Sequence, residues 1–234
     1  EGFRDHSNGQ ATRVSANVGY QFSPEFETRF YLNANEVRQR IPGTVTKTSA
    51  LTNPEGAAPA NVTMDQQRNI DTVRVANKST IRFDNTVVDF GAFGVDRHLM
   101  HPIFQWLDYR YRDYGGFAKV TDDRFIGGFR NRFVAGINIL NGSIDNQQFA
   151  NIGGQKGALL SSSIDRSENT SLYLEDSFYF LPNVAAIAGT QFLYATRNRQ
   201  DRFLSNGDQS GSTEFRMWSP KAGLLWQVDP TWQV

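Results

Sequence analysis

The chain has 234 residues, which is enough for one large domain or two small ones. Its 24 basic and 24 acidic residues cancel, so no net positive field points to a nucleic-acid partner. It contains no cysteine, which excludes disulfide frameworks, thiolate metal sites and cysteine nucleophiles. The longest purely apolar run is about five residues, so a transmembrane helix of ~20 residues is excluded. A membrane-spanning strand is not excluded, because only every second residue of such a strand is apolar.

The first predicted element covers residues 13–22, where polar and apolar side chains alternate without a break. One face carries Val14, Ala16, Val18, Tyr20 and Phe22, and the other carries Arg13, Ser15, Asn17, Gly19 and Gln21. A two-residue period predicts a strand with one apolar and one polar side. Ser23-Pro24 predicts a turn, and the alternation resumes over residues 28–35.

The same pattern continues to the end of the chain. Further strands are predicted over residues 73–83, 88–92, 116–121, 131–139, 171–180, 184–196 and 215–228, and a tenth opens at Trp232. Short turns are predicted near 23–26, 84–86, 122–126, 181–183 and 228–231, and long polar loops near 40–67, 97–113, 140–168 and 198–213. Short and long connections alternate, which indicates an antiparallel up-and-down meander of the kind found in outer-membrane barrels.

The strands of a soluble β-sandwich or lipocalin would also alternate polar and apolar residues, with the apolar face turned inward. Two features favour a membrane barrel instead. Charged and amide residues occupy the polar faces of nearly every predicted strand, as expected for a wet lumen. Aromatic rings lie near strand ends, where the two membrane interfaces would be: Tyr20, Phe22, Phe26, Phe83, Phe178, Phe180, Trp218, Trp226 and Trp232. The predicted fold class is therefore all-β, a partial transmembrane β-barrel.

Several segments resemble the barrel of TonB-dependent outer-membrane receptors. They are EGFRDHS and GYQFSPEFETRFYL near the start, residues 41–60 beginning IPGTVTK, RHLMHPIF (97–104), SLYLEDSF (171–178) and the closing FRMWSPKAGLLWQVDPTWQV. Their order along the chain carries the resemblance, which covers essentially all of it and is closest to the ferric citrate and siderophore branch.

The resemblance implies a bacterial outer-membrane receptor whose barrel of about 22 strands encloses a plug domain. Such receptors import ferric chelates with energy from the TonB complex, surrounded by outer-membrane lipid and lipopolysaccharide. With nine or ten predicted strands, residues 1–234 would be a fragment of the barrel domain, without the plug domain and the remaining strands. A passive porin-type channel and a soluble β-sheet binding protein remain the alternatives.

The predicted loop 97–113 holds the candidate ligand-binding residues. They are Arg97, His98, His101, Trp106, Tyr109, Arg110, Tyr111 and Arg112. Arginine presents a planar fork to oxyanions and stacks on rings, so an anionic, oxygen-rich ferric chelate would suit this set. The alternative is that these side chains only pair across a hairpin at the level of the lipopolysaccharide.

No chemistry on a substrate is predicted. The chain has no GxSxG, P-loop or HExxH motif, so an enzyme is not expected. His98 and His101 lack a suitable third ligand nearby, so neither a metal site nor a cofactor is expected.

Charged residues on the polar faces are interpreted mainly as wall charges that pair with acids on neighbouring strands or on a plug. They are Arg29, Arg74, Lys78, Arg82, Arg130 and Arg132. Glu175 and Asp176 are adjacent and point to opposite sides of a strand, so they cannot form an acid–base pair at one centre. The alternation leaves Asp176 unexplained on an otherwise apolar side.

Overall fold

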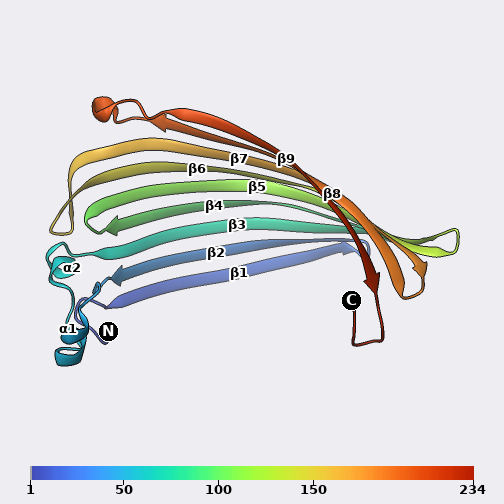
Figure 1. The fold of residues 1–234 in the computed structure, drawn as a ribbon, viewed down its shortest axis with the longest axis horizontal. Coiled ribbons are helices and arrows are strands. Elements are labelled where there is room, and N and C mark those ends of the chain that lie inside the picture. Colours follow the sequence, from blue (N-terminus) through green and yellow to red (C-terminus); the bar gives the residue numbers. More distant parts are fainter. Residues whose placement is uncertain (1) are drawn as a thin grey trace.

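The computed structural model describes residues 2–234 as one antiparallel sheet of nine strands that follow one another in chain order (Figure 1). The strands are β1 (Gly9–Ser23), β2 (Phe26–Arg40), β3 (Gln67–Phe83), β4 (Thr86–Pro102), β5 (Gln105–Ile126), β6 (Phe129–Ile152), β7 (Gln155–Leu181), β8 (Val184–Asp201) and β9 (Gly211–Trp226). Two short helices, α1 (Lys47–Thr52) and α2 (Pro59–Thr63), lie between β2 and β3, and a 3-10 turn, η1 (Leu204–Asn206), between β8 and β9. No helix in residues 2–234 is long and apolar enough to cross a membrane. The predicted up-and-down meander is confirmed.

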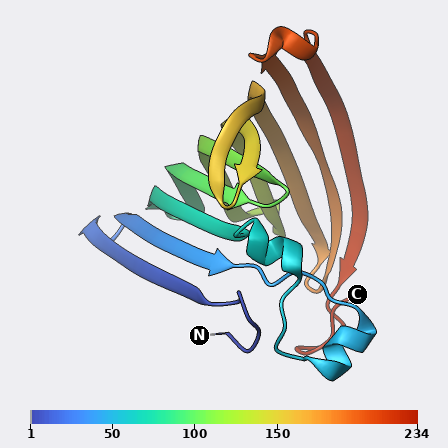
Figure 2. The same ribbon diagram turned by 90° about the vertical axis from the view of Figure 1, so that its left-hand side faces the viewer.

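The sheet is strongly curved and open, with β1 and β9 as its two edges (Figure 2). Strands β5, β6 and β7 have 22, 24 and 27 residues. A barrel strand needs only about 9–11 residues to cross a bilayer. In a membrane barrel, long parts of these strands would therefore continue beyond the membrane-spanning band as paired hairpins.

This extension corrects the predicted loops. Residues 97–113 and 140–168 are not loops, because β4 continues into β5 and β6 into β7 through connections of two residues, 103–104 and 153–154. The predicted loop 198–213 shrinks to 202–210. Polar composition was misleading, because backbone pairing between neighbouring strands satisfies the peptide groups in water as well as in lipid. The loop predicted at 40–67 is confirmed and carries α1 and α2.

The turn after β5 also differs from the prediction. It lies at Gly127–Gly128 rather than in residues 122–126, and both glycines have positive φ, 61° and 87°. Two consecutive positive φ angles are typical of the tight hairpin turns that glycine favours. The predicted tenth strand at Trp232 is reduced to an isolated bridge between Gln227 and Gln233.

Strand pairing, with register shifts only near a few strand ends, keeps side chains of one kind on the same face from strand to strand, so the sheet has an apolar face and a polar face. The apolar face carries, for example, Val18, Phe30, Val75, Ala92, Ile137, Leu172, Phe192 and Trp218, and the polar face carries Asn17, Arg29, Lys78, Asp89, Lys119, Tyr173, Glu175 and Lys221. In a membrane barrel the apolar face contacts lipid and the polar face lines the lumen.

Three of the six predicted wall charges, Lys78, Arg82 and Arg130, pair with acids across strands on the polar face, whereas Arg29, Arg74 and Arg132 make no ion pair within residues 2–234. Asp89 lies 3.1 Å from Lys78 and 3.3 Å from Lys119. Arg82 pairs with Glu27 at 2.8 Å, and Arg130 pairs with Asp123 at 2.6 Å. The basic partners are half-exposed, although the Asp89 carboxylate is largely buried, so these contacts contribute modestly to stability and mainly keep the wall neutral.

Aromatic rings on the polar face lie over glycines of neighbouring strands. A Cβ atom added at Gly115 would lie 2.8 Å from the Phe93 ring, and one at Gly91 would lie 2.9 Å from Phe117. The same relationship joins Tyr173 and Gly136, where the distance would be 2.4 Å. Glycine is required at these positions because any side chain would occupy the space of the ring.

The structure also accounts for Asp176 on the apolar face. The amide nitrogen of Asn131 donates to both of its carboxylate oxygens, at 2.9 and 3.0 Å. Both residues lie close to the short turns at one end of the sheet, so the pair is placed near the edge of the apolar band rather than at its centre.

Candidate functional site

The predicted site residues belong to β4 and β5, and the register divides them between the two faces. Arg97, His101, Tyr109 and Tyr111 share the polar face, and His98, Trp106, Arg110 and Arg112 share the apolar face. The division arises because residues 97–113 belong to strands rather than to a loop, and successive side chains of a strand point to opposite faces.

Of the polar-face members, Arg97 and Tyr111 stack on each other, whereas Tyr109 and His101 contact residues of β6 and β3. The guanidinium of Arg97 lies over the Tyr111 ring, 4.0 Å from its centre. The side-chain amide of Gln148 donates to the Tyr109 hydroxyl at 3.0 Å, and burial raises the pKa of Tyr109. The His101 ring, in turn, lies 2.5 Å from the carbonyl oxygen of Gln67 on β3.

On the apolar face, His98 belongs to a charged cluster near the hairpin tips. Its Nε2 atom lies 2.6 Å from the Asp108 carboxylate, which also accepts from Lys156. Burial alone would raise the pKa of Asp108, but the hydrogen bonds and charges of Lys156 and His98 hold it below its usual range. Trp106 is also near these tips, and its buried indole N–H has no partner within residues 2–234.

The histidine positions bear on metal binding. His98 and His101 point to opposite sides of β4, so their rings cannot bind one ion together. Residues 2–234 contain no group of three or more side chains placed to hold a metal.

A groove of about 540 Å³ lies beside Tyr111 at the same end of the sheet. Two rows of directly opposed residues cross it on the polar face. The first row is Arg97, Tyr111, Ile144, Asp165, Arg199 and Gly211, and the second is Val95, Asp113, Gly142, Ser167, Arg197 and Thr213. Arg97 and Val95 lie at the ends of these rows, beside the groove rather than in its lining. The lining also includes Gln209, from the connection between β8 and β9, and the intervening residues Ser143, Arg166, Asn198 and Ser212. We refer to this site as the polar groove.

Two arginines supply the main hydrogen-bond donors of the polar groove. Arg199 makes a long contact of 3.9 Å with Asp165, and its buried Nε atom has no partner within the described chain. Arg197 donates to the Asn169 side chain at 2.9 Å and remains exposed. Since Asp113 and Asp165 also line the groove, it suits a polar ligand that offers oxyanions to the guanidiniums and donors to the carboxylates.

Arg197, Arg199, Asp165 and Gln209 are not among the residues predicted from the sequence. Asp165 falls in the predicted loop 140–168, and Arg199 and Gln209 fall in the predicted loop 198–213, where no face is assigned; Arg197 comes directly after the predicted strand 184–196. The alternation of β8 gave only a weak signal: Arg197 and Arg199 share the face of Gln191, but Leu193 and Ala195 lie between them and interrupt the polar pattern.

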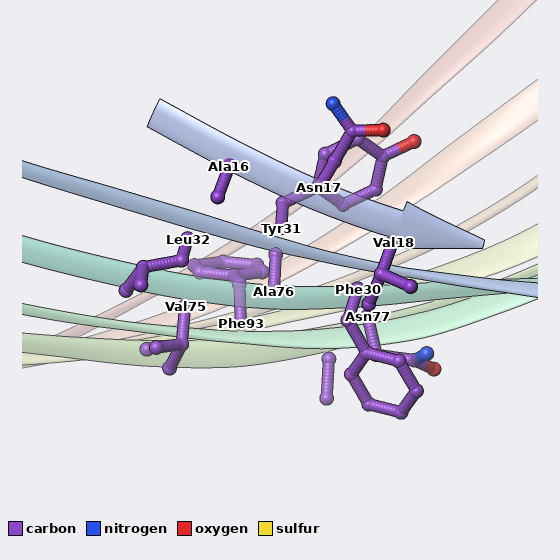
Figure 3. A pocket seen from close by; sticks show the side chains of 12 residues that line it. Ala16, Asn17, Val18, Phe30, Tyr31, Leu32, Val75, Ala76, Asn77 and Phe93 are labelled. Carbon is purple, nitrogen blue, oxygen red and sulfur yellow. The ribbon is translucent and has the colours of Figure 1, made fainter. Parts of the chain in front are cut away.

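A second hollow, of about 630 Å³, lies on the apolar face over β1 to β4. Figure 3 shows Val18, Phe30, Leu32 and Val75 on one side of the sheet, with Tyr31 on the other. Its lining offers no charged group, so it suits contact with hydrocarbon rather than with a polar ligand.

Comparison with known proteins gives the same architecture. A family model described as "TonB dependent receptor-like, beta-barrel" matches residues 2–234. The unliganded ferric citrate transporter FecA is similar in structure, with a TM-score of 0.87 and 13% identity, over 98% of this chain and 35% of that one. The ferric preacinetobactin receptor BauA of Acinetobacter baumannii has a TM-score of 0.78 and 10% identity, over 98% and 39%. The siderophore receptor PiuA, also from Acinetobacter baumannii, has a TM-score of 0.76 and 10% identity, over 96% and 41%.

Proposed function

Because the chain belongs to the TonB-dependent receptor β-barrel family, we propose that it forms part of the barrel wall of an outer-membrane receptor that imports a ferric chelate. The chain spans 35–41% of the length of the three similar structures named above. The plug domain, the TonB complex and the remaining strands are accordingly proposed as parts and partners of a longer receptor. The family consists of bacterial outer-membrane receptors and transporters, and no enzymatic role is proposed.

The polar groove carries the proposal for ligand binding. It lies on the face that lines the lumen in a barrel of this family, at the end where the strands extend into hairpins. Arg197 and Arg199 direct guanidinium donors toward it, with the stacked pair of Arg97 and Tyr111 beside it. Ferric citrate and ferric siderophores are the ligands named for similar structures, and oxygen-rich anions of that kind match these donors.

We test this with the full-length receptor in cells that have or lack a working TonB complex. Uptake of radioactive iron is measured for ferric citrate, a ferric catecholate and a ferric hydroxamate. We expect TonB-dependent uptake of at least one chelate. The double variant Arg197→Gln/Arg199→Gln should weaken binding of that chelate about tenfold or more, a loss comparable to one or two charge-assisted hydrogen bonds.

The matched control is Arg216→Gln, on the apolar face of β9, where Arg216 already pairs with Glu214 at 3.1 Å. It removes one arginine without touching the polar groove and should leave chelate binding unchanged. Uptake that does not depend on TonB would favour a passive channel. Normal chelate affinity in the double variant would remove the polar groove from the binding site.

A further inference from the structure

We infer that the polar groove continues into an apolar contact surface, and that the ferric chelate therefore carries an apolar acyl or aryl group beside its anionic iron centre. This rests on the proposed function and narrows the class of chelate. The surface consists of Leu140, Leu193, Phe215 and Met217, on the polar face of β6, β8 and β9. We refer to it as the apolar shelf.

The apolar shelf lies directly beside the polar groove. On β9, Phe215 follows Thr213 of the groove on the same face. On β6, Leu140 comes two residues before Gly142 of the groove, again on the same face. Two residues span about 7 Å along a strand, so the shelf begins about 7 Å from the edge of the groove. A ligand held in the groove needs only a short extension to reach it.

Two rows of opposed residues contain the shelf, and neither row has a charged side chain between β4 and β9. The first row is Phe93, Gly115, Leu140, Asn169, Ala195 and Phe215, and the second is Gly91, Phe117, Asn138, Ser171, Leu193 and Met217. The row on the groove side contains Asp113 and Arg197. The row on the other side contains Asp89 and Lys119. The shelf is therefore an apolar band between two charged rows of the same face.

The shelf side chains are accessible on a face that elsewhere carries polar groups. The exposed fraction is 43% for Leu140, 53% for Phe215 and 54% for Met217. Covering apolar surface of this kind is favourable by about 25 cal/mol per Å² removed from water. A ligand that offers an apolar group at this position would gain affinity from contacts that a wholly polar ligand cannot make.

The combination of groove and shelf favours an amphipathic chelate over a compact one. The guanidiniums of Arg197 and Arg199 suit oxyanions around the iron. A compact chelate such as ferric citrate would fill the groove and leave the shelf uncovered. A chelate with an acyl or aryl substituent would place its iron centre at the same arginines and cover Leu140 and Phe215 with the substituent.

The test uses the full-length receptor purified in a non-ionic detergent, with a citrate-based dihydroxamate chelator loaded with Fe³⁺. The chelator is made in two forms whose hydroxamate acyl groups are acetyl or octanoyl, so both present the same oxygen atoms to iron. Binding is measured by equilibrium dialysis, and micelles without receptor give the partition of each form, which is subtracted. We expect the octanoyl form to bind about tenfold more tightly or better, which is the effect of burying about two methylene groups.

The double variant Phe215→Ser/Met217→Ser should lose most of this preference and keep its affinity for the acetyl form. The matched control is Ile187→Ser/Leu225→Ser, which removes two apolar side chains from the same face of β8 and β9 near the short turns and should keep the preference. If the double variant fails to fold, Phe215→Ser and Met217→Ser are measured singly.

Three results would overturn the inference. They are equal affinity of the wild type for the two forms, an unchanged preference in the folded shelf variants, and an equal loss of affinity for both forms in those variants. The last result would assign the shelf to contact with another part of the receptor.

The same measurements separate this inference from the proposed function. A receptor that imports a ferric chelate but shows no preference for the octanoyl form, or binds neither form, would overturn the inference and leave the proposed function standing. The variant Arg197→Gln/Arg199→Gln should weaken binding of both forms alike. If it binds both forms normally while the shelf variant loses the preference, the polar groove is overturned and the apolar shelf stands.

Discussion

The side-chain amide nitrogen of Asn151 lies 2.6 Å from the carbonyl oxygen of Ile103, and so joins the tip of the β6–β7 hairpin to the tip of the β4–β5 hairpin. The same nitrogen lies 2.9 Å from the carbonyl oxygen of Met64, at the end of α2. Its side-chain oxygen accepts from the backbone N–H of Gly154 at 2.8 Å. One side chain thus connects three segments that are far apart in the sequence.

We expect Asn151→Ala to release the connection between β2 and β3 without unfolding the sheet. Each lost hydrogen bond costs about 0.5–1.5 kcal/mol, and the loss concerns only the tips. Hydrogen exchange of residues 41–66 should become faster, while exchange in the paired centres of β3 and β4 stays unchanged. Gln200→Ala, on an exposed position of β8 with no side-chain hydrogen bond, is the control. Equal exchange in wild type and Asn151→Ala would show that the loop is held by other contacts.

Because aromatic rings cover some glycines of the sheet and not others, replacing glycine by alanine should lower stability at the covered positions only. At Gly115 the new Cβ would lie 2.2 Å from the carbonyl oxygen of Ile139, as well as close to Phe93. Gly115→Ala should therefore destabilise the barrel by about 1–3 kcal/mol, the usual range for overpacking. Gly94→Ala on β4 is the matched control, since its nearest neighbour would be a Val75 methyl at 3.8 Å. The stability of both variants is measured by denaturant unfolding in detergent. Equal unfolding midpoints for Gly115→Ala and Gly94→Ala would contradict the prediction.

The contacts of Asp108 predict a loss of order in acid at the tip of the β4–β5 hairpin. Its pKa is lowered in the folded protein, because the hydrogen bonds of Lys156 and His98 outweigh the effect of burial. A lowered pKa means that the stabilisation is fully present above the ordinary value near 3.9 and is lost as pH falls through the lower folded value. Amide hydrogen exchange at the tip of the β4–β5 hairpin, corrected for the pH dependence of the intrinsic exchange rate, should become faster below about pH 4.

Asp108→Asn is the control for this acid effect, because an amide does not titrate in this range. The variant should show a more mobile tip already at pH 7 and no further loss of order below pH 4. The same acid response in wild type and variant would assign it to another group.

The division of predicted site residues between two faces gives a direct comparison. Arg97→Gln removes the guanidinium stacked on Tyr111 beside the polar groove, and we expect it to weaken chelate binding several-fold. Arg110→Gln changes a residue of the same hairpin on the opposite face and should leave chelate affinity unchanged. Titration of purified full-length receptor with the chelate it imports provides the measurement. The reverse order of effects would return the ligand to the apolar-face arginines.

The meander, its two-sided strands and most of its short turns could be predicted from the sequence. A strand side chain alternates with a period of two, so residues 13–22 show their two faces without knowledge of any neighbour. Turn residues act equally locally, as at Pro24 and Pro182. The same alternation predicts that the wall charges share one face, because paired strands place their polar positions on the same side of the sheet.

Only the tertiary structure decided where the strands end and which side chains meet at the candidate site. Residues 97–113 are polar and aromatic, and their composition does not distinguish a loop from a hairpin whose backbone is paired in water. Pairing of that segment placed Arg97 and Arg112 on opposite faces, and it brought Arg97 into one row with Arg199, about a hundred residues later. Such a row depends on the register of four successive strand pairs, and register is a property of the assembled sheet rather than of any one segment.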